Sequence, residues 1–229
     1  MLKKNINWIG IALVSLIVIV VVIIGVLYII GYARLARKYD IQPEIVSIST
    51  DAASIQQGQH WAKTLCSHCH GEDFSGVVLI KDSTVGYIPA LNLTSGDGGA
   101  VSEFTHADWV RALRHGVDPE GRALVGMTSQ NYYYLSDKDL GILISYLKSV
   151  PPVNHEMGEP AISSMAKILL AAGMFGENIL PAESITHSST CPPAVYPGTT
   201  TQYGEYIVRL FGHWGRSHPA WSRFGRIGA

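Results

Sequence analysis

Five consecutive residues carry the clearest chemistry in the sequence, since residues 66–70 read Cys-Ser-His-Cys-His. The pattern C-x-x-C-H is the attachment signature of a c-type haem. Two cysteines three positions apart lie on one side of a helical turn, so each sulfur can add to one vinyl group of the haem. His70 is then held under the iron as its proximal ligand, and its other ring nitrogen needs a hydrogen-bond partner. The prediction is one haem c, bound covalently through Cys66 and Cys69, with His68 as an exposed spacer.

Two other uses of a cysteine pair fit the sequence less well. A zinc ribbon needs a second pair of ligands, and the only other cysteine is the isolated Cys191. A thioredoxin-like redox pair needs a βαβ context, whereas the residues around this motif predict helix and loop. The haem therefore remains the best interpretation of the motif.

The sixth iron ligand is predicted to be Met127. A low-spin electron carrier needs two strong axial ligands, and a thioether opposite histidine raises the reduction potential. Met127 lies in a predicted loop after the middle helix, where its side chain can fold over the distal face. Filling the core is the commoner task of a methionine. His106 and His115 are the alternative ligands, although both are better explained as residues at helix ends.

Two predicted helices would position the haem motif. Residues 54–65 lead into the motif, and Gly58 within them suggests that another helix crosses closely at that point. The crossing partner is the segment 137–150, which has apolar residues at helical spacing. Ser136 and Asp139 predict its capped start, and the prolines at 151 and 152 end it.

A third helix is predicted over 106–115, with Thr105 and Asp108 at its start and Gly116 at its end. Its Trp109 would pack either on the haem edge or in the ordinary core.

The segment 54–153 resembles the bacterial membrane-anchored class I cytochromes c, including the cytochrome subunits that accept electrons from periplasmic alcohol, aldehyde or gluconate dehydrogenases. The resemblance covers about 100 residues. It implies that Pro89 lies near His70 and that the Pro89 carbonyl accepts the imidazole N–H. The matching residues are 58–60, 66–71, 89–94, 109–114, 126–127 and 135–137.

Composition and charge restrict the class of protein. The chain has 229 residues, of which 47% are hydrophobic and 15% charged, so a disordered chain is excluded. Residues 40–205 hold 18 acidic and 8 basic residues and carry a net charge of −10. An acidic body argues against binding of nucleic acid, which favours a basic surface, and suits a protein partner with a basic docking face. Simple solubility would explain the charge equally well.

An N-terminal membrane anchor is predicted over residues 9–30, which contain no charge. Twenty-two helical residues extend roughly 33 Å, enough to cross a bilayer, and the apolar run is too long for a signal peptide. The basic residues that flank the helix slightly favour a cytoplasmic location for the residues that follow it. This is the opposite of what a haem domain outside the cytoplasm requires. The predicted periplasmic or extracytoplasmic location of the haem domain therefore rests on the cytochrome resemblance, because haem is attached to this motif outside the cytoplasm.

The second half of the sequence predicts less regular structure. Residues 161–175 have the pattern of an amphipathic helix, and residues 181–201, which include Cys191 as a lone thiol, are rich in Pro, Ser and Thr and predict an extended linker. Residues 203–210 resemble the helix before the haem motif, but Gly212, Gly215 and Arg216 stand where the motif would be. By the resemblance, a second haem domain would start here. Residues 211–229 are interpreted as a truncated or out-of-frame tail, a degenerated domain or a basic membrane-surface segment.

The predicted fold class is all-α: an anchor (1–38), a cytochrome c domain (39–153), a helix with a linker (154–203) and a remnant or truncated start of a second domain (204–229). The predicted function is single-electron transfer by a membrane-anchored monohaem cytochrome in a respiratory or dehydrogenase-linked chain, without substrate chemistry of its own. Its redox partner would be a dehydrogenase or a terminal oxidase. The main alternative is a haem-based sensor with an open sixth coordination position. A peroxidase-like role would need a distal acid/base group near an open iron, for which only His106 is available.

Overall fold

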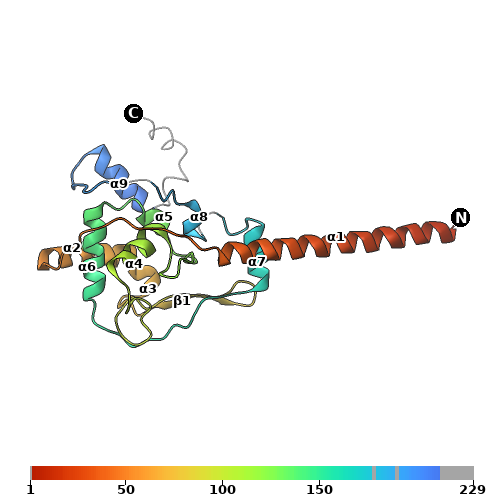
Figure 1. Ribbon diagram of the computed structural model, residues 1–229, viewed down its shortest axis with the longest axis horizontal. Helices are drawn as coiled ribbons and strands as arrows, with labels where there is room; N and C mark the ends of the chain where they lie inside the picture. Colours follow the sequence, from red (N-terminus) through yellow and green to blue (C-terminus); the bar gives the residue numbers. More distant parts are fainter. Residues whose placement is uncertain (1, 177–178, 189–190, 212–229) are drawn as a thin grey trace.

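The computed structural model describes residues 2–176, 179–188 and 191–211. It is mostly helical: one long helix projects from a body of short helices and a small sheet (Figure 1). The helices are α1 (Leu2–Ala36), α2 (Ala52–Leu65), α3 (Ser67–His70), α4 (His106–Val110), α5 (Ser129–Tyr132), α6 (Asp137–Ser149), α7 (Ser164–Ala171), α8 (Pro181–Ser184) and α9 (Thr201–Phe211); the strands are β1 (Val77–Asp82), β2 (Gly86–Ala90) and β3 (Ala161–Ile162).

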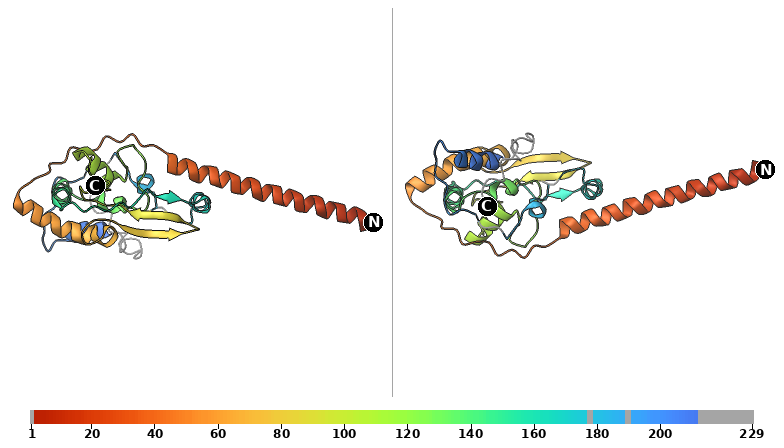
Figure 2. Two further views of the ribbon diagram at one scale, coloured as in Figure 1. Left: turned by 90° about the horizontal axis from the view of Figure 1, so that it is seen from below. Right: turned by 90° about the horizontal axis from the view of Figure 1, so that it is seen from above.

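The apolar N-terminal segment forms α1, which extends away from the body in all three views (Figures 1 and 2). Its stretch Trp8–Ala36 is long and apolar enough to cross a membrane. Residues 8–26 are exposed throughout, and the helix meets the body only in its last turns, where it packs against α7. The predicted helix over 9–30 is therefore present, and it continues beyond both predicted ends.

The core of the body is built on the crossing of α2 and α6, as the sequence predicted. At Gly58 the helices approach so closely that a Cβ atom would lie 2.0 Å from the carbonyl oxygen of Ile142. Asp51 caps α2 by accepting a hydrogen bond from the backbone N–H of Ser54 (2.9 Å), so the helix begins at Ala52 rather than 54. Ser136 caps α6 as predicted, and the extended Val150 ends it.

The middle helix is also capped as predicted, but its second half is wider than an α-helix. Thr105 and Asp108 form a reciprocal capping box on α4. Residues Arg111–His115 then continue as a π-helix, which ends at Gly116 in the left-handed conformation, with φ of 66°. The sequence predicts one regular helix over 106–115, and no residue pattern in it marks the change of hydrogen bonding.

A three-stranded antiparallel sheet, in the order β1-β2-β3, was not foreseen by the all-α prediction. Strands β1 and β2 form a hairpin, and β3 pairs with the start of β2. Because Ala161 and Ile162 join the sheet, the helix expected over 161–175 is shorter. It starts only after Ser163, whose side chain accepts a hydrogen bond from the N–H of Ala166.

The segment after α7 folds back on the body rather than extending as a free linker. Its first part contains the short helix α8, which begins with Pro181. Proline is common at the first position of a helix. Its last described part, α9, buries Tyr206 and Leu210 in the same core cluster as α2 and α6. Of the predicted tail, 211–229, the residues from 212 on lie outside the described residues. The division at 153 and 203 remains a prediction.

We expect Gly58→Ala to lower the free energy of unfolding by about 1–3 kcal/mol, the usual cost of overpacking a core, because the new methyl group overlaps the backbone of α6. The matched control is Gly204→Ala in α9, where a Cβ meets nothing within 4 Å. That change should be neutral or stabilise by up to about 1 kcal/mol through helix propensity. Guanidinium unfolding of the detergent-solubilised protein measures both; equal effects of the two substitutions would contradict the close crossing.

Candidate functional site: an apolar cavity above the cysteine pair

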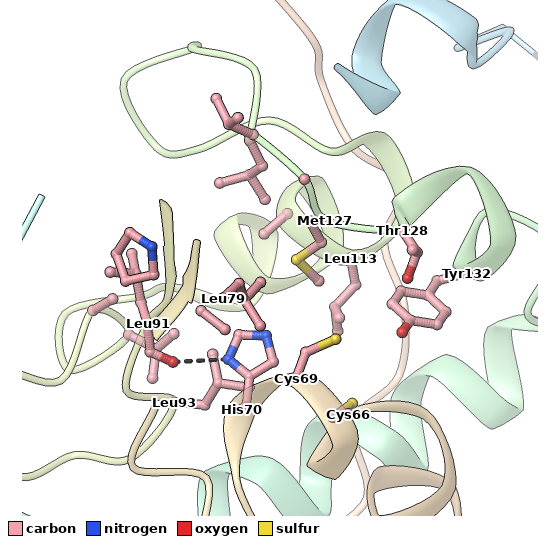
Figure 3. A pocket seen from close by; sticks show the side chains of 18 of the residues that line it. Cys66, Cys69, His70, Leu79, Leu91, Leu93, Leu113, Met127, Thr128 and Tyr132 are labelled. Atoms are coloured by element: carbon pink, nitrogen blue, oxygen red, sulfur yellow. Dashed lines mark hydrogen bonds between the residues drawn. The ribbon is translucent and has the colours of Figure 1, made fainter. Parts of the chain in front are cut away.

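The haem-attachment motif forms a single tight turn at the end of α2. Cys66 ends α2 and starts α3, and its carbonyl accepts hydrogen bonds from the N–H groups of Cys69 (3.2 Å) and His70 (2.9 Å). This turn places both cysteines and His70 on the wall of one cavity (Figure 3). His68 is exposed and does not line the cavity. Burial raises the pKa of the Cys66 thiol to about 12.

The His70 ring is oriented by a backbone carbonyl. Its Nδ1 lies 2.8 Å from the carbonyl oxygen of Leu91. A carbonyl only accepts hydrogen bonds, so Nδ1 carries the proton in this contact and Nε2 keeps its lone pair, the form that binds metals. Burial lowers the pKa of His70, more than the bond to Leu91 raises it, which also favours the neutral ring.

The acceptor differs from the one that the resemblance implied. Pro89 lies in β2, opposite Val78 of the hairpin, and it lines the cavity without bonding the His70 ring. Leu91 is the first residue after β2, where the chain leaves the hairpin. The implied role of the Pro89 carbonyl is therefore wrong. The hydrogen-bond acceptor is the carbonyl of Leu91, two residues further along the chain, just after the hairpin ends.

The cavity contains about 1030 Å³ of space that protein atoms do not fill, part of it open to solvent. Its walls are largely apolar and come from α2, α3, the β1–β2 hairpin, α4, the π-helix, α5 and the neighbouring loops. The residues that line it besides the motif include Leu65, Leu79, Pro89, Leu91, Leu93, Val101, Phe104, Trp109, Leu113, Leu124, Val125, Met127 and Tyr132.

Met127 lies across the cavity from the histidine, and its sulfur points into the same space (Figure 3). The preceding Gly126 has a positive φ of 75°, and its N–H donates to the carbonyl of Ile179 (2.8 Å). The loop that carries Met127 is therefore supported by the segment after α7. Among the described methionines Met127 alone lines the cavity: Met157 is buried elsewhere, and Met165 and Met174 are exposed.

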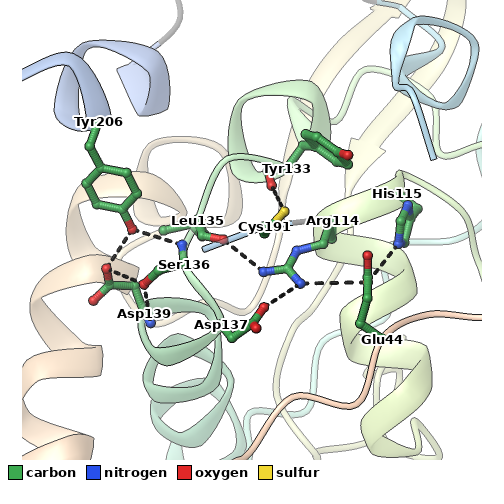
Figure 4. Close-up of polar contacts among 10 residues, drawn as sticks. All are labelled: Glu44, Arg114, His115, Tyr133, Leu135, Ser136, Asp137, Asp139, Cys191 and Tyr206. Carbon is green, nitrogen blue, oxygen red and sulfur yellow. Dashed lines mark hydrogen bonds and ion pairs between the residues drawn. The ribbon is translucent and has the colours of Figure 1, made fainter. Parts of the chain in front are cut away.

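The two alternative histidine ligands lie away from the cavity. His106 is exposed at the start of α4. His115 is 1% exposed, and its ring nitrogens lie 3.1 Å from Glu44 Oε2 and 3.1 Å from His187 Nδ1. Figure 4 shows His115 beside Glu44 in a polar cluster. Neither residue lines the cavity. No distal acid/base group is provided by either histidine.

The same polar cluster joins the C-terminal segment to the body (Figure 4). Arg114 is fully buried; it donates to the Leu135 carbonyl (2.8 Å) and pairs with Asp137 (2.9 Å). The Tyr206 hydroxyl of α9 donates to Asp139 (2.6 Å), and burial raises the pKa of Tyr206. The Cys191 thiol donates to the Tyr133 carbonyl (3.0 Å), outside the cavity.

No sequence pattern singles out Leu91 or Tyr132 as a residue of the site. Leu91 acts through its backbone, which a side-chain pattern does not reveal. Tyr132 of α5 lines the cavity and donates from its hydroxyl to the Leu65 carbonyl at the end of α2 (2.7 Å). Trp109, left open as haem contact or core residue, both lines the cavity and belongs to the core, where it is 3% exposed.

The residues present fit a haem c. Two thiols on one turn can form the thioethers, an imidazole with a free Nε2 can bind the iron, and a thioether faces it across apolar walls. The hydrogen bond from Nδ1 to the Leu91 carbonyl fixes the orientation of the His70 ring, as is usual for a histidine that binds a metal through its other nitrogen.

Comparison with known proteins agrees with this geometry. Residues 55–151 match the family model of cytochrome c. The chain is 28% identical over 177 residues to the alcohol dehydrogenase (quinone) cytochrome c subunit of Gluconacetobacter polyoxogenes, covering 73% of this chain and 36% of that protein. The corresponding subunit of Gluconobacter oxydans (strain 621H) is 28% identical over 176 residues, covering 73% and 35%.

The gluconate 2-dehydrogenase cytochrome c subunit of Pantoea cypripedii is 26% identical over 177 residues, covering 72% of this chain and 38% of that protein. The chain thus spans just over a third of the length of these relatives. The matched segment runs from α2 to the end of α6 and includes every residue that lines the cavity except Pro160. Residues 55–151 form a cytochrome c domain.

We expect Met127→Ala to leave the haem attached but to lower the reduction potential by about 0.1 V or more, a fraction of the roughly 0.8 V range that axial ligands command. The loss follows because a thioether opposite histidine raises the potential. Potentiometric titration followed by absorbance measures it. The control is Met174→Ala, which changes an exposed methionine outside the cavity. An unchanged potential in Met127→Ala would show that another residue is the ligand.

Proposed function

We propose that the protein is a membrane-anchored monohaem c-type cytochrome that transfers single electrons. The observation that carries the proposal is the placement of His70 and Met127 on facing walls of one apolar cavity, above the Cys66 and Cys69 turn. When bound, the haem supplies the reversible one-electron chemistry of its iron. The cytochrome c domain and the dehydrogenase cytochrome subunits among its relatives support electron transfer.

The chain's own residues would do three things for the cofactor. The Leu91 carbonyl holds the His70 ring in one tautomer and orientation. Met127 closes the distal side on a loop supported by Ile179. The apolar walls would limit the access of water to the iron, and among the described residues they include no carboxylate and no histidine besides His70. Two ligands and largely apolar walls favour an electron carrier over the alternative, a sensor with an open coordination position.

The proposed location is the membrane, with the haem domain on the extracytoplasmic side. Helix α1 supports a single span, because its apolar stretch is long enough and is exposed over residues 8–26. The side follows from the chemistry of attachment rather than from charge counting, since Arg34, Arg37 and Lys38 would then lie outside against the usual bias.

The proposed partners are redox proteins, in the first place a dehydrogenase. The relatives from Gluconobacter and Pantoea are cytochrome subunits of an alcohol and a gluconate dehydrogenase. The acidic body between residues 40 and 205 favours a partner with a basic docking face. It disfavours nucleic acid. A terminal oxidase is the alternative partner in a respiratory chain.

The proposal predicts one covalent haem for each chain, because the sequence has one C-x-x-C-H motif and no second cysteine pair. Intact-protein mass spectrometry should give the apoprotein mass plus one haem, and the haem should resist extraction with acidified acetone. The variant with Cys66→Ala and Cys69→Ala should lose it. A mass with two haems, or haem that is extracted from the unchanged protein, would refute the assignment.

The proposed topology predicts a specific pattern of proteolysis. Protease added to intact spheroplasts should degrade the haem domain, while an epitope tag at the N-terminus stays protected until lysis, because a single span separates the two. Immunoblots against the tag and haem staining of the domain report the two ends. If the haem domain survives in intact spheroplasts and is cleaved only after lysis, the proposed side of the membrane is wrong.

A further inference from the structure

We propose that α7 and the turn after it, residues 164–176, lie in the lipid headgroup layer beside α1, so that the haem domain binds the membrane surface as well as being tethered to it. The inference rests on the proposed membrane span. It adds a second contact with the bilayer, formed by the body itself, which would fix the orientation of the haem domain. Below, residues 164–176 are called the surface segment.

The depth of the surface segment follows from the length of the free part of α1. Residues 8–26 are all exposed, and Leu27 is the first residue after them that is partly buried. Nineteen helical residues extend roughly 28 Å, close to the hydrocarbon thickness of about 30 Å. If these residues span the bilayer, the body begins where the hydrocarbon ends.

Helix α7 lies at that boundary. It crosses α1 at Gly31, where a Cβ atom would come within 1.9 Å of the Lys167 carbonyl oxygen. Gly31 is buried in this crossing, while the neighbouring Ile30 and Tyr32 are exposed. Figures 1 and 2 show α7 lying across α1 where the long helix leaves the body. An element that crosses a membrane span at its end runs along the membrane surface.

The surface segment has the composition of an interfacial element. Its residues include no acid and a single base, Lys167. Met165 and Met174 are 51% and 71% exposed, although they are among the largest apolar side chains of the segment. Two exposed apolar side chains of this size beside a membrane span can bury their surface in the lipid interface.

Aromatic and basic groups surround the crossing as they do at a membrane boundary. The Lys167 ammonium lies 5.7 Å from the ring centroid of Tyr28. Tyr28 and Tyr32 of α1 are both exposed, at the level where tyrosines are enriched in membrane proteins. Arg37 and Lys38, just beyond, are exposed cations that can meet lipid phosphates. This arrangement favours lipid over a second protein as the occupant of the segment.

The end of α1 is held rigidly to the body, so the position of the surface segment is determined by the span. Arg34 donates from Nη1 to the Leu170 carbonyl at the end of α7 (2.6 Å). Its Nε and Nη2 bond the Glu183 carboxylate of α8 (3.1 and 2.5 Å). A bidentate arginine pair adds geometric specificity. The haem domain therefore cannot swing freely about its anchor.

The test measures how fast single cysteines react in a bilayer. Met165→Cys and Met174→Cys are made separately in a Cys191→Ser background, as full-length haem-loaded protein in nanodiscs of phosphatidylethanolamine and phosphatidylglycerol, with empty discs in excess. The probe is an anionic, water-soluble methanethiosulfonate. Gln57→Cys, on exposed α2 at the far end of the body, is the aqueous control. Ile17→Cys, in the middle of the span, is the control for anchoring.

We expect Cys at 165 and at 174 to react about tenfold more slowly than at 57, because the water-soluble reagent reaches a thiol held in lipid only in the small fraction of protein whose surface segment has left the bilayer. Rates at 165 and 174 equal to that at 57, with position 17 protected, would overturn the surface contact and leave the span intact. A fast reaction at 17 would overturn the span, and the inference with it. Protection that appears only when several proteins share a disc would assign the segment to a second copy and overturn the lipid contact.

Discussion

The hydrogen bond between the His70 ring and the Leu91 carbonyl is the constraint on which the rest of the domain depends. An imidazole can serve as an iron ligand only if one nitrogen is free and correctly aimed, and a carbonyl on the other nitrogen secures both conditions. This hydrogen bond requires two separate parts of the fold to end next to each other. Helix α2 must end so that α3 carries the histidine, and the β1–β2 hairpin must end so that Leu91 faces the ring. The small sheet thus has a role in an otherwise helical domain.

The opposite wall depends on a part of the chain that is not within the matched cytochrome segment. Met127 is carried by a loop whose Gly126 donates to Ile179, and Ile179 belongs to the segment after α7. Ser129, two residues after Met127, donates from its hydroxyl to the Ala112 carbonyl (2.9 Å) and ties the loop to the π-helix. The C-terminal segment therefore supports the distal side of the cavity, in addition to burying Tyr206 and Leu210 against the core.

Features governed by local chemistry could be predicted from the sequence, and features governed by distant backbone contacts could not. The caps at Thr105 and Ser136, the end at Gly116 and the close crossing at Gly58 are each marked by the residue that performs the task. The haem motif is equally local, and Met127 was singled out by chemistry and by its place in a loop.

The hairpin, the π-helix and the His70 acceptor had no such marker. Strand β1 has an irregular pairing between Val78 and Ile80, which disturbs the alternation that identifies strands. The acceptor is a main-chain carbonyl, which any residue possesses. The return of residues 179–188 and 191–211 onto the body depends on tertiary contacts such as Tyr206 with Asp139. A Pro-, Ser- and Thr-rich composition by itself predicts only an irregular chain.

The central claim is that the cavity holds an iron bound by His70 and Met127, and proton–carbon NMR of the reduced holoprotein tests it most directly. With ¹³C at the methyl groups of the five methionines, the account predicts one methyl resonance moved far upfield by the haem ring current, and its loss in Met127→Leu. Such a shift arises only for a methyl held directly above the haem plane. Five methyl resonances at ordinary positions, or an upfield resonance that persists in Met127→Leu, would contradict it.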